Sequence, residues 1–121
     1  MRFMTIYKPA DPTGMEAGIP PTQDEIARMG QFIGELAKSG VLVAADGLLA
    51  SANGARVRLS KGKITVTDGP FTESKELIAG FAIMEVKSKA EAIELAERFL
   101  RIAGDGESEI RQMYDAPAFA R

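Results

Sequence analysis

The sequence predicts an α+β fold of the ferredoxin-like type, with two helices on one face of an antiparallel sheet. Two segments, 22–39 and 88–102, repeat apolar residues at helical spacing. Strand-like segments surround them in the order strand–helix–strand, hairpin, strand–helix–strand, or β-α-β(β-β)-β-α-β. Packing both helices against one side of a sheet is the simplest way to bury their apolar faces in that order. The length of 121 residues suits a single domain over 1–121.

Residues 2–8 predict the first strand because their side chains alternate between two faces. One face carries Phe3, Thr5 and Tyr7, and the other carries Met4 and Ile6. Pro9 ends the strand, since it has no N–H to donate to a ladder. The following loop, 10–21, is rich in Gly and Pro and long for a compact domain, which is typical of functional lids or mobile segments.

The first helix is predicted over residues 22–39. It begins with a capping box from Thr22 to Glu25, in which side-chain oxygens satisfy early backbone N–H groups. The apolar positions at helical spacing are Ile26, Met29, Ile33 and Leu36. Gly40 then supplies a C-terminal cap.

The middle of the chain predicts extended structure and a β-hairpin. Residues 41–50 read as a strand with a kink, and 51–54 as a turn. Two short strands over 56–59 and 64–67 flank a turn and form the hairpin. Residues 68–70, Asp-Gly-Pro, then break the ladder.

The segment 78–87 predicts a central strand, because it is apolar on both faces. Phe81 and Ile83 lie on one face, and Ala82, Met84 and Val86 on the other. A second capping box, Ser88 to Glu91, opens a helix that runs to about residue 102. Glu94–Arg98 and Glu97–Arg101 are expected ion pairs on its outer surface. Gly104 closes this helix, and residues 109–114 predict the last strand.

Two helices can cover only one face of this sheet. Either Met4 and Ile6 or Phe3 and Tyr7, together with one face of residues 78–86, would be bare in a single copy. An apolar surface of that size usually marks an interface. We therefore expect a homodimer, with two sheets packed face to face by two-fold symmetry as a dimeric α+β barrel.

Composition limits the classes of function. The 15 Lys and Arg are balanced by 17 Asp and Glu, and neither half of the chain is basic, so direct binding to nucleic acid is not expected. There is no cysteine and no histidine, which removes thiolate chemistry and the commonest general base and metal ligand. We expect no metal and no cofactor. The chain also lacks a signal-peptide pattern and a membrane-spanning stretch, so a soluble cytoplasmic protein is expected.

The segment 67–76, Thr-Asp-Gly-Pro-Phe-Thr-Glu-Ser-Lys-Glu, is the most distinctive motif. It resembles the signature of the YCII-related family, in the branch named for Asp-Gly-Pro-Phe. Met4–Tyr7, Ser39–Leu42, Arg58, Gly80 and Glu109–Arg111 support the resemblance along nearly the whole chain. The resemblance implies a ferredoxin-like protomer and a dimeric barrel but no single function. Some relatives of this branch occur beside or fused to extracytoplasmic-function sigma factors.

This sequence departs from the family pattern at two places. The namesake branch has been suspected of activity through a His–Asp pair, and this chain has no histidine. Gln112 stands where the branch commonly has Pro after the arginine of the last strand.

Asp68, Lys75 and Glu76 are the candidate catalytic residues. One interpretation is a pocket in which Lys75 and Arg58 hold an anion and Glu76 or Asp68 moves a proton. The alternative is structural: Asp68 to Phe71 form a turn that plugs the core, and the charges of the motif pair with Arg56 or Arg58 of the hairpin.

The candidate ligand-binding residues are Tyr7, Arg58, Asp68, Glu73, Lys75, Glu76 and Arg111. We expect Tyr7 and Arg111 to lie on strands that adjoin only through a central partner, where both can line one cleft. Arg111 can hold a carboxylate, or it can pair with a nearby glutamate.

Three functions follow. The leading hypothesis is a homodimer that binds a small, anionic molecule in a polar cleft. The first alternative is an enzyme that acts on a small organic acid or carbonyl compound with carboxylate or lysine chemistry. The second is a regulatory protein that binds a transcription factor through its dimer surface.

Overall fold

The computed structural model describes residues 1–71 and 76–115, and Glu73 and Lys75 of the motif lie outside this part. The elements are, in order, β1 (Arg2–Pro9), α1 (Thr13–Glu16), α2 (Gln23–Lys38), β2 (Leu42–Gly47), a 3₁₀ turn (Ser51–Asn53), β3 (Ala55–Ser60), β4 (Lys63–Asp68), β5 (Gly80–Glu85), α3 (Lys89–Ala103) and β6 (Gly106–Gln112).

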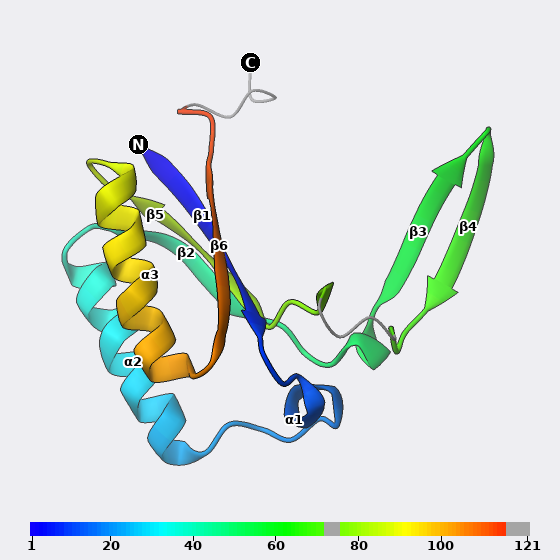
Figure 1. The fold of residues 1–121 in the computed structure, drawn as a ribbon, viewed down its shortest axis with the longest axis horizontal. Coiled ribbons are helices and arrows are strands. Elements are labelled where there is room, and N and C mark those ends of the chain that lie inside the picture. Colours follow the sequence, from blue (N-terminus) through cyan, green and yellow to red (C-terminus); the bar gives the residue numbers. More distant parts are fainter. Residues whose placement is uncertain (72–75, 116–121) are drawn as a thin grey trace.

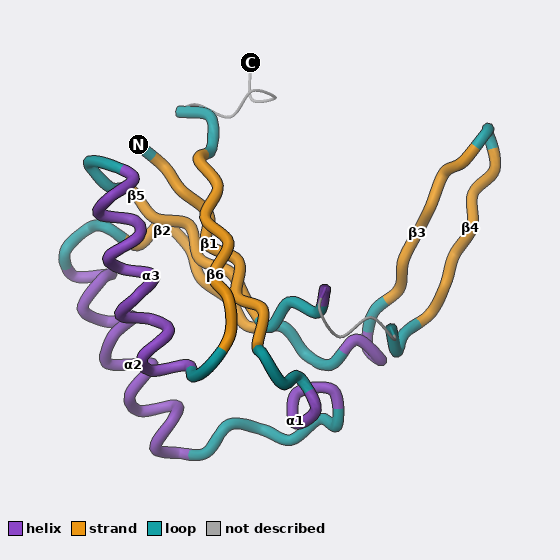
Figure 2. Tube along the Cα trace, viewed as in Figure 1, coloured by secondary structure: helices purple, strands orange, loops and turns teal. Residues whose placement is uncertain are grey.

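Four strands form an antiparallel sheet in the order β2-β5-β1-β6, which is the ferredoxin-like arrangement. Helices α2 and α3 lie side by side on one face of this sheet (Figure 1). The strands β3 and β4 form a separate two-stranded hairpin that stands apart from the sheet, as Figure 2 shows. The predicted fold class is confirmed, with β5 in the centre as expected.

Local signals set the ends of both long helices. The Thr22 hydroxyl accepts a hydrogen bond from the Glu25 N–H at 3.1 Å, and the Ser88 hydroxyl accepts one from the Glu91 N–H at 3.1 Å. The glycines after the helices, Gly40 and Gly104, have φ angles of 80° and 103°. Such angles favour glycine, which explains why both helices end there.

The helices bury their apolar faces against the sheet. The core on this side is formed by Phe3, Met84, Val86 and Ala92, with Phe32 and Leu36 of α2 and Ala96 of α3 also buried. Met84 lies opposite Phe3 across the β1–β5 ladder. Phe3, Thr5 and Tyr7 therefore face the helices, and Met4 and Ile6 lie on the face away from them, which we call the open face.

Several predicted details differ from the structure. The loop 10–21 contains the short helix α1, and β2 ends at Gly47 after a bulge rather than continuing to residue 50. The last strand is displaced toward the N-terminus, to Gly106–Gln112. Arg98 pairs with Glu35 of α2 at 2.6 Å and its guanidinium lies over the Phe32 ring, because the two helices pack side by side and offer a nearer partner than Glu94.

Candidate functional site

The Asp-Gly-Pro-Phe motif lies at the base of the hairpin, where β4 ends. The Gly69 N–H donates to the Gly54 carbonyl at 3.0 Å, which extends the β3–β4 pairing by one step. A Cβ atom on Gly69 would lie 1.7 Å from the Ser51 carbonyl oxygen, closer than any real contact. Only glycine fits here, so the glycine of the motif is required by packing.

Ser51 connects the motif to the first loop of the chain. Its backbone N–H donates to Glu16 Oε1 at 2.8 Å, and its hydroxyl makes a short hydrogen bond to the other oxygen of the same carboxylate. The Ser51 hydroxyl also accepts from the Phe71 N–H at 2.9 Å. These hydrogen bonds stabilise the charged carboxylate and lower the pKa of Glu16 below its ordinary value. The chain Glu16–Ser51–Phe71 thus ties α1, the 3₁₀ turn and the motif together.

Arg56 connects the hairpin to the other side of the motif. Its guanidinium carbon lies 4.1 Å from the centre of the Phe71 ring, a distance at which a cation is attracted to the ring face. The same guanidinium lies 3.9 Å from Glu76 Oε2. Both side chains of this ion pair are exposed, so the pair adds little stability.

The ion pair of the motif with the hairpin fits the structural interpretation, but Phe71 is half-buried against Arg56 and is not among the buried core residues. Phe71 and Glu76 contact Arg56, and Arg56 rather than Arg58 is the hairpin arginine beside the motif. Arg58 lies opposite Thr65 on the exposed hairpin. The carboxylate of Asp68 is exposed and has no side-chain partner among the described residues. The expected contacts of Glu73 and Lys75 fall outside this part of the chain.

Tyr7 and Arg111 lie on opposite faces of the sheet, which corrects the expectation that they line one cleft. The strands β1 and β6 are direct neighbours, with Tyr7 opposite Ser108 and Arg111 opposite Met4. Because side chains alternate along a strand, Arg111 shares the open face with Met4, whereas Tyr7 faces the helices.

Each of these two residues has a local partner. The Tyr7 ring packs edge-on against Phe99 at 5.1 Å, and its hydroxyl donates to the Gly104 carbonyl at 3.1 Å. Burial, and next the charge of Asp105, raise the pKa of the Tyr7 hydroxyl above its ordinary value. Arg111 lies 3.3 Å from Glu109, as the alternative interpretation predicted.

The open face has an apolar centre and a charged border. Its centre is formed by the half-buried side chains of Met4, Ile6, Phe81 and Ile83, which lie opposite one another across β1 and β5. At the β6 edge of this face, the Glu109 carboxylate accepts a hydrogen bond from Lys8 at 3.2 Å and a second one from Arg111. Both hydrogen bonds lower the pKa of Glu109.

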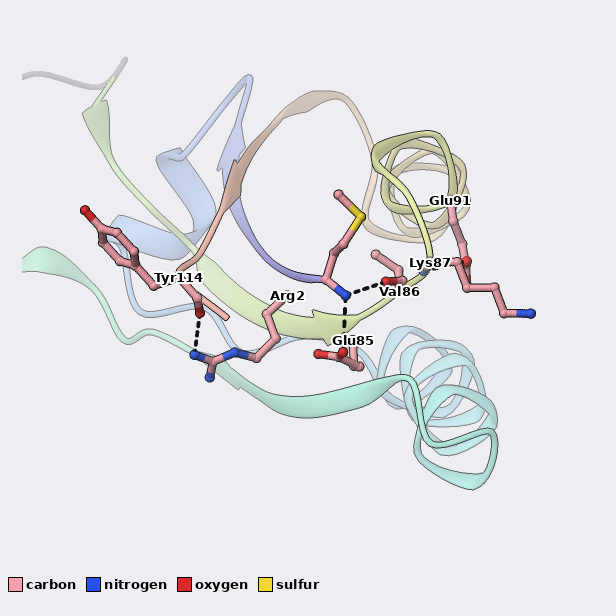
Figure 3. Close-up of polar contacts among 7 residues, drawn as sticks. Arg2, Glu85, Val86, Lys87, Glu91 and Tyr114 are labelled. Carbon is pink, nitrogen blue, oxygen red and sulfur yellow. Dashed lines mark hydrogen bonds and ion pairs between the residues drawn. The ribbon is translucent and has the colours of Figure 1, made fainter. Parts of the chain in front are cut away.

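The end of this face is tied by polar contacts to the N-terminus (Figure 3). The terminal amino group lies 3.2 Å from Glu85 and donates to the Val86 carbonyl at 2.9 Å. Arg2 donates to the Tyr114 carbonyl at 2.8 Å. These contacts fix the ends of three adjacent strands, so the open face is a preformed surface.

Two surface hollows lie away from the motif. One is lined by residues 111–115 after β6, and the other lies between α2 and α3 and is lined by Arg28, Phe32, Arg98 and Arg101 among others. Within residues 1–71 and 76–115, no group of three or more acidic, histidine or cysteine side chains could hold a metal ion. No helix in the same ranges is long and apolar enough to cross a membrane.

Sequence reasoning missed Glu16 and Ser51. Both fell in segments predicted as a loop and a turn, and nothing local in the sequence marks a contact between them. Arg56 and Arg58 lie on the same face of β3, so periodicity alone could not separate them.

Comparison with known proteins identifies the family. The model of the YCII-related domain matches residues 1–116. The chain belongs to the YCII-related domain family. The match is to the family as a whole, and the Asp-Gly-Pro-Phe branch stays a prediction.

A solved structure shares the fold of this YCII-related chain. It is similar to 5-chloro-2-hydroxyhydroquinone dehydrochlorinase (TftG) from Burkholderia phenoliruptrix AC1100, in complex with 2,5-dihydroxybenzoquinone, with a TM-score of 0.57 and 17% sequence identity. The similarity covers 96% of each chain. At this identity the likeness shows a common fold. No curated protein matches the sequence.

Proposed function

We propose that this YCII-related chain is a homodimer that binds a small molecule. The observation that carries the proposal is the open face, where Met4, Ile6, Phe81 and Ile83 form an apolar centre that the described helices leave uncovered. Apolar surface of this kind on a preformed sheet usually marks an interface. A second copy, related by two-fold symmetry, covers it by presenting the same face.

The ligand of the proposed dimer is a small organic anion held beside the motif loop. Lys75 and Arg56, the hairpin arginine beside the motif, supply positive charge, while Asp68, Glu73 and Glu76 supply carboxylates for hydroxyl or protonated groups of the ligand. Support comes from the Glu16–Ser51–Phe71 chain and from Arg56, which together hold the base of the loop in one conformation. A fixed base of the loop favours binding because less entropy is lost when a ligand orders the site.

A second candidate function is an enzyme that acts on a small carbonyl or hydroxylated ring compound. The observation that favours it is the shared fold with a dehydrochlorinase bound to a dihydroxybenzoquinone. Without histidine or cysteine, proton transfer in this chain would rely on a carboxylate or on Lys75. Asp68 is the better placed carboxylate, since Glu76 already pairs with Arg56.

A thermal-shift screen tests the proposal. Wild type and Lys75→Ala are heated with 2,5-dihydroxybenzoquinone and a panel of small organic acids, and Lys89→Ala, at the exposed start of α3, serves as the control. A ligand at 100 times its Kd stabilises the protein by about 2.7 kcal/mol, which is roughly 10 °C in Tm for a domain of this size. We expect that shift in wild type and in Lys89→Ala and a much smaller one in Lys75→Ala. Equal shifts in all three proteins would remove Lys75 from the site.

A further inference from the structure

The β3–β4 hairpin, residues 55–68, carries a continuous apolar strip on one face. We call this hairpin the arm. Val57 lies opposite Val66 and Leu59 opposite Ile64, so the four side chains share one face, and they are 57–69% exposed. The opposite face is polar and basic, with Arg56, Arg58, Lys63, Thr65 and Thr67. In an amphipathic hairpin of this kind, the apolar face is stabilised when it is covered and shielded from water.

The arm receives little support from its own chain. Figure 1 shows that it stands clear of the four-stranded sheet and the helices, and the contacts described for it lie at its base. A two-stranded hairpin alone in water is marginally stable at best. The strip must therefore be covered by another molecule or by another part of the chain.

The described residues of the motif contact the polar face of the arm and not the strip. Arg56 lies over Phe71 and beside Glu76, so the polar face at the base of the arm is turned toward the motif. Val57 follows Arg56 and points to the opposite side. The strip is thus directed away from Phe71 and Glu76 of the same copy.

We propose that the apolar strip of the arm docks on a second copy of this chain, beside the surface where the two sheets meet. This inference rests on the proposed homodimer and names the part of the chain that holds it together. In Figure 1 the arm stands across from the open face of the sheet. A second copy packed on that face therefore lies within reach of the arm.

Area supports this choice of partner. A specific interface buries about 800 Å² on each partner. The centre of the open face consists of half-buried side chains and leaves only part of that area. Exposures of 57–69% at four aliphatic side chains add on the order of 400 Å², which is as large as the largest apolar patch on a typical monomer.

Charge supports it as well. The arm holds four of the 15 Lys and Arg and one of the 17 Asp and Glu, so it carries a net charge of +3 and the rest of the chain −5. A basic arm is attracted to the acidic body of a second copy. The arm contains no aromatic residue on which a nucleic-acid base could stack, so its charge does not favour single-stranded RNA or DNA.

Val66→Asp and Thr65→Asp form a matched pair that tests the inference. The two residues are neighbours on β4, on opposite faces of the arm, and the substitutions add the same charge. We expect Val66→Asp to raise the Kd of dimerisation by at least about 100-fold in sedimentation equilibrium, while Thr65→Asp leaves it within about threefold of wild type. Equal values for the two variants would overturn the inference.

Ile83→Asp, on the open face, separates this inference from the proposed dimer. If Ile83→Asp dissociates the dimer and Val66→Asp does not, the sheets pair without the arm. If the wild-type chain is itself monomeric, the proposed homodimer is wrong, and the docking of the arm is wrong with it.

Cysteine labelling gives an independent readout, because the chain has no native cysteine. Leu59→Cys on the strip should react with a maleimide more slowly as the protein concentration rises through the Kd of dimerisation, whereas Thr65→Cys should react at a constant rate. A constant rate at both positions would contradict docking, and equal protection at both would show that the strip is not the contact.

Discussion

Replacing Gly69 with alanine tests whether the motif is a packed joint between the hairpin and the body. The added Cβ would lie 1.7 Å from the Ser51 carbonyl oxygen, 2.5 Å from the carbonyl carbon and 3.1 Å from Ala52 Cα. All three are backbone atoms, so no flexible side chain can move aside to make room. Either the 3₁₀ turn or the motif loop must shift, which also disturbs the Ser51 hydrogen bonds to Glu16 and Phe71.

The expected loss of stability follows from the severity of this steric clash. Overpacking typically costs 1–3 kcal/mol, and loss of the Phe71 N–H bond to Ser51 adds about 1 kcal/mol. We expect Gly69→Ala to lower the free energy of unfolding by about 2–4 kcal/mol. For a chain of 121 residues this corresponds to a fall in Tm of roughly 10 °C.

The same substitution at Gly30 provides a control of opposite sign. Gly30 lies inside α2, and a Cβ there would meet nothing within 4 Å. Gly30→Ala should stabilise the helix by about 1 kcal/mol. Thermal unfolding followed by circular dichroism compares the two variants with wild type. If Gly69→Ala unfolds at the wild-type temperature, the close packing of the motif on Ser51 is wrong.

Two further predictions concern titration. The hydrogen bonds to Glu16 lower its pKa from 4.5, so the stability that they provide is complete above about pH 4.5 and is lost as the pH falls through the lowered value. Glu16→Gln should therefore lower Tm at pH 7, and its difference from wild type should shrink as the pH is lowered below 4.5. A pH-independent difference would contradict this. The pKa of the Tyr7 hydroxyl is raised above 10.0, and Tyr7 is the remaining tyrosine in Tyr114→Phe. In this variant, tyrosinate absorbance should appear above pH 10 in the folded protein and at lower pH in the protein unfolded in urea. Identical titration curves would show that the Tyr7 ring is not packed under α3.

The fold could be predicted because its signals are local. Thr22 and Ser88 are spaced correctly from Glu25 and Glu91, and each pair caps its helix within one turn. The alternation of residues 2–8 gave the two faces of β1, and the apolar character of residues 78–87 gave the central place of β5. Each of these signals depends on neighbours within a few positions.

The candidate site could be predicted only in part, because its contacts are long-range. The motif was recognisable from consecutive residues, but its anchors Glu16 and Ser51 come from two different loops. Arg98 showed the same limitation, since its partner Glu35 is on the other helix. Tyr7 and Arg111 were expected on strands separated by a central partner, whereas the structure pairs β1 with β6 directly and its register places the two residues on opposite faces.

Sedimentation equilibrium of the wild-type chain at micromolar concentration tests the central claim most directly. The chain has a mass of 13.0 kDa, and the homodimer predicts a species of twice that mass that does not dissociate on tenfold dilution. A single species of 13.0 kDa across the same range would contradict the proposed assembly and the docking of the arm.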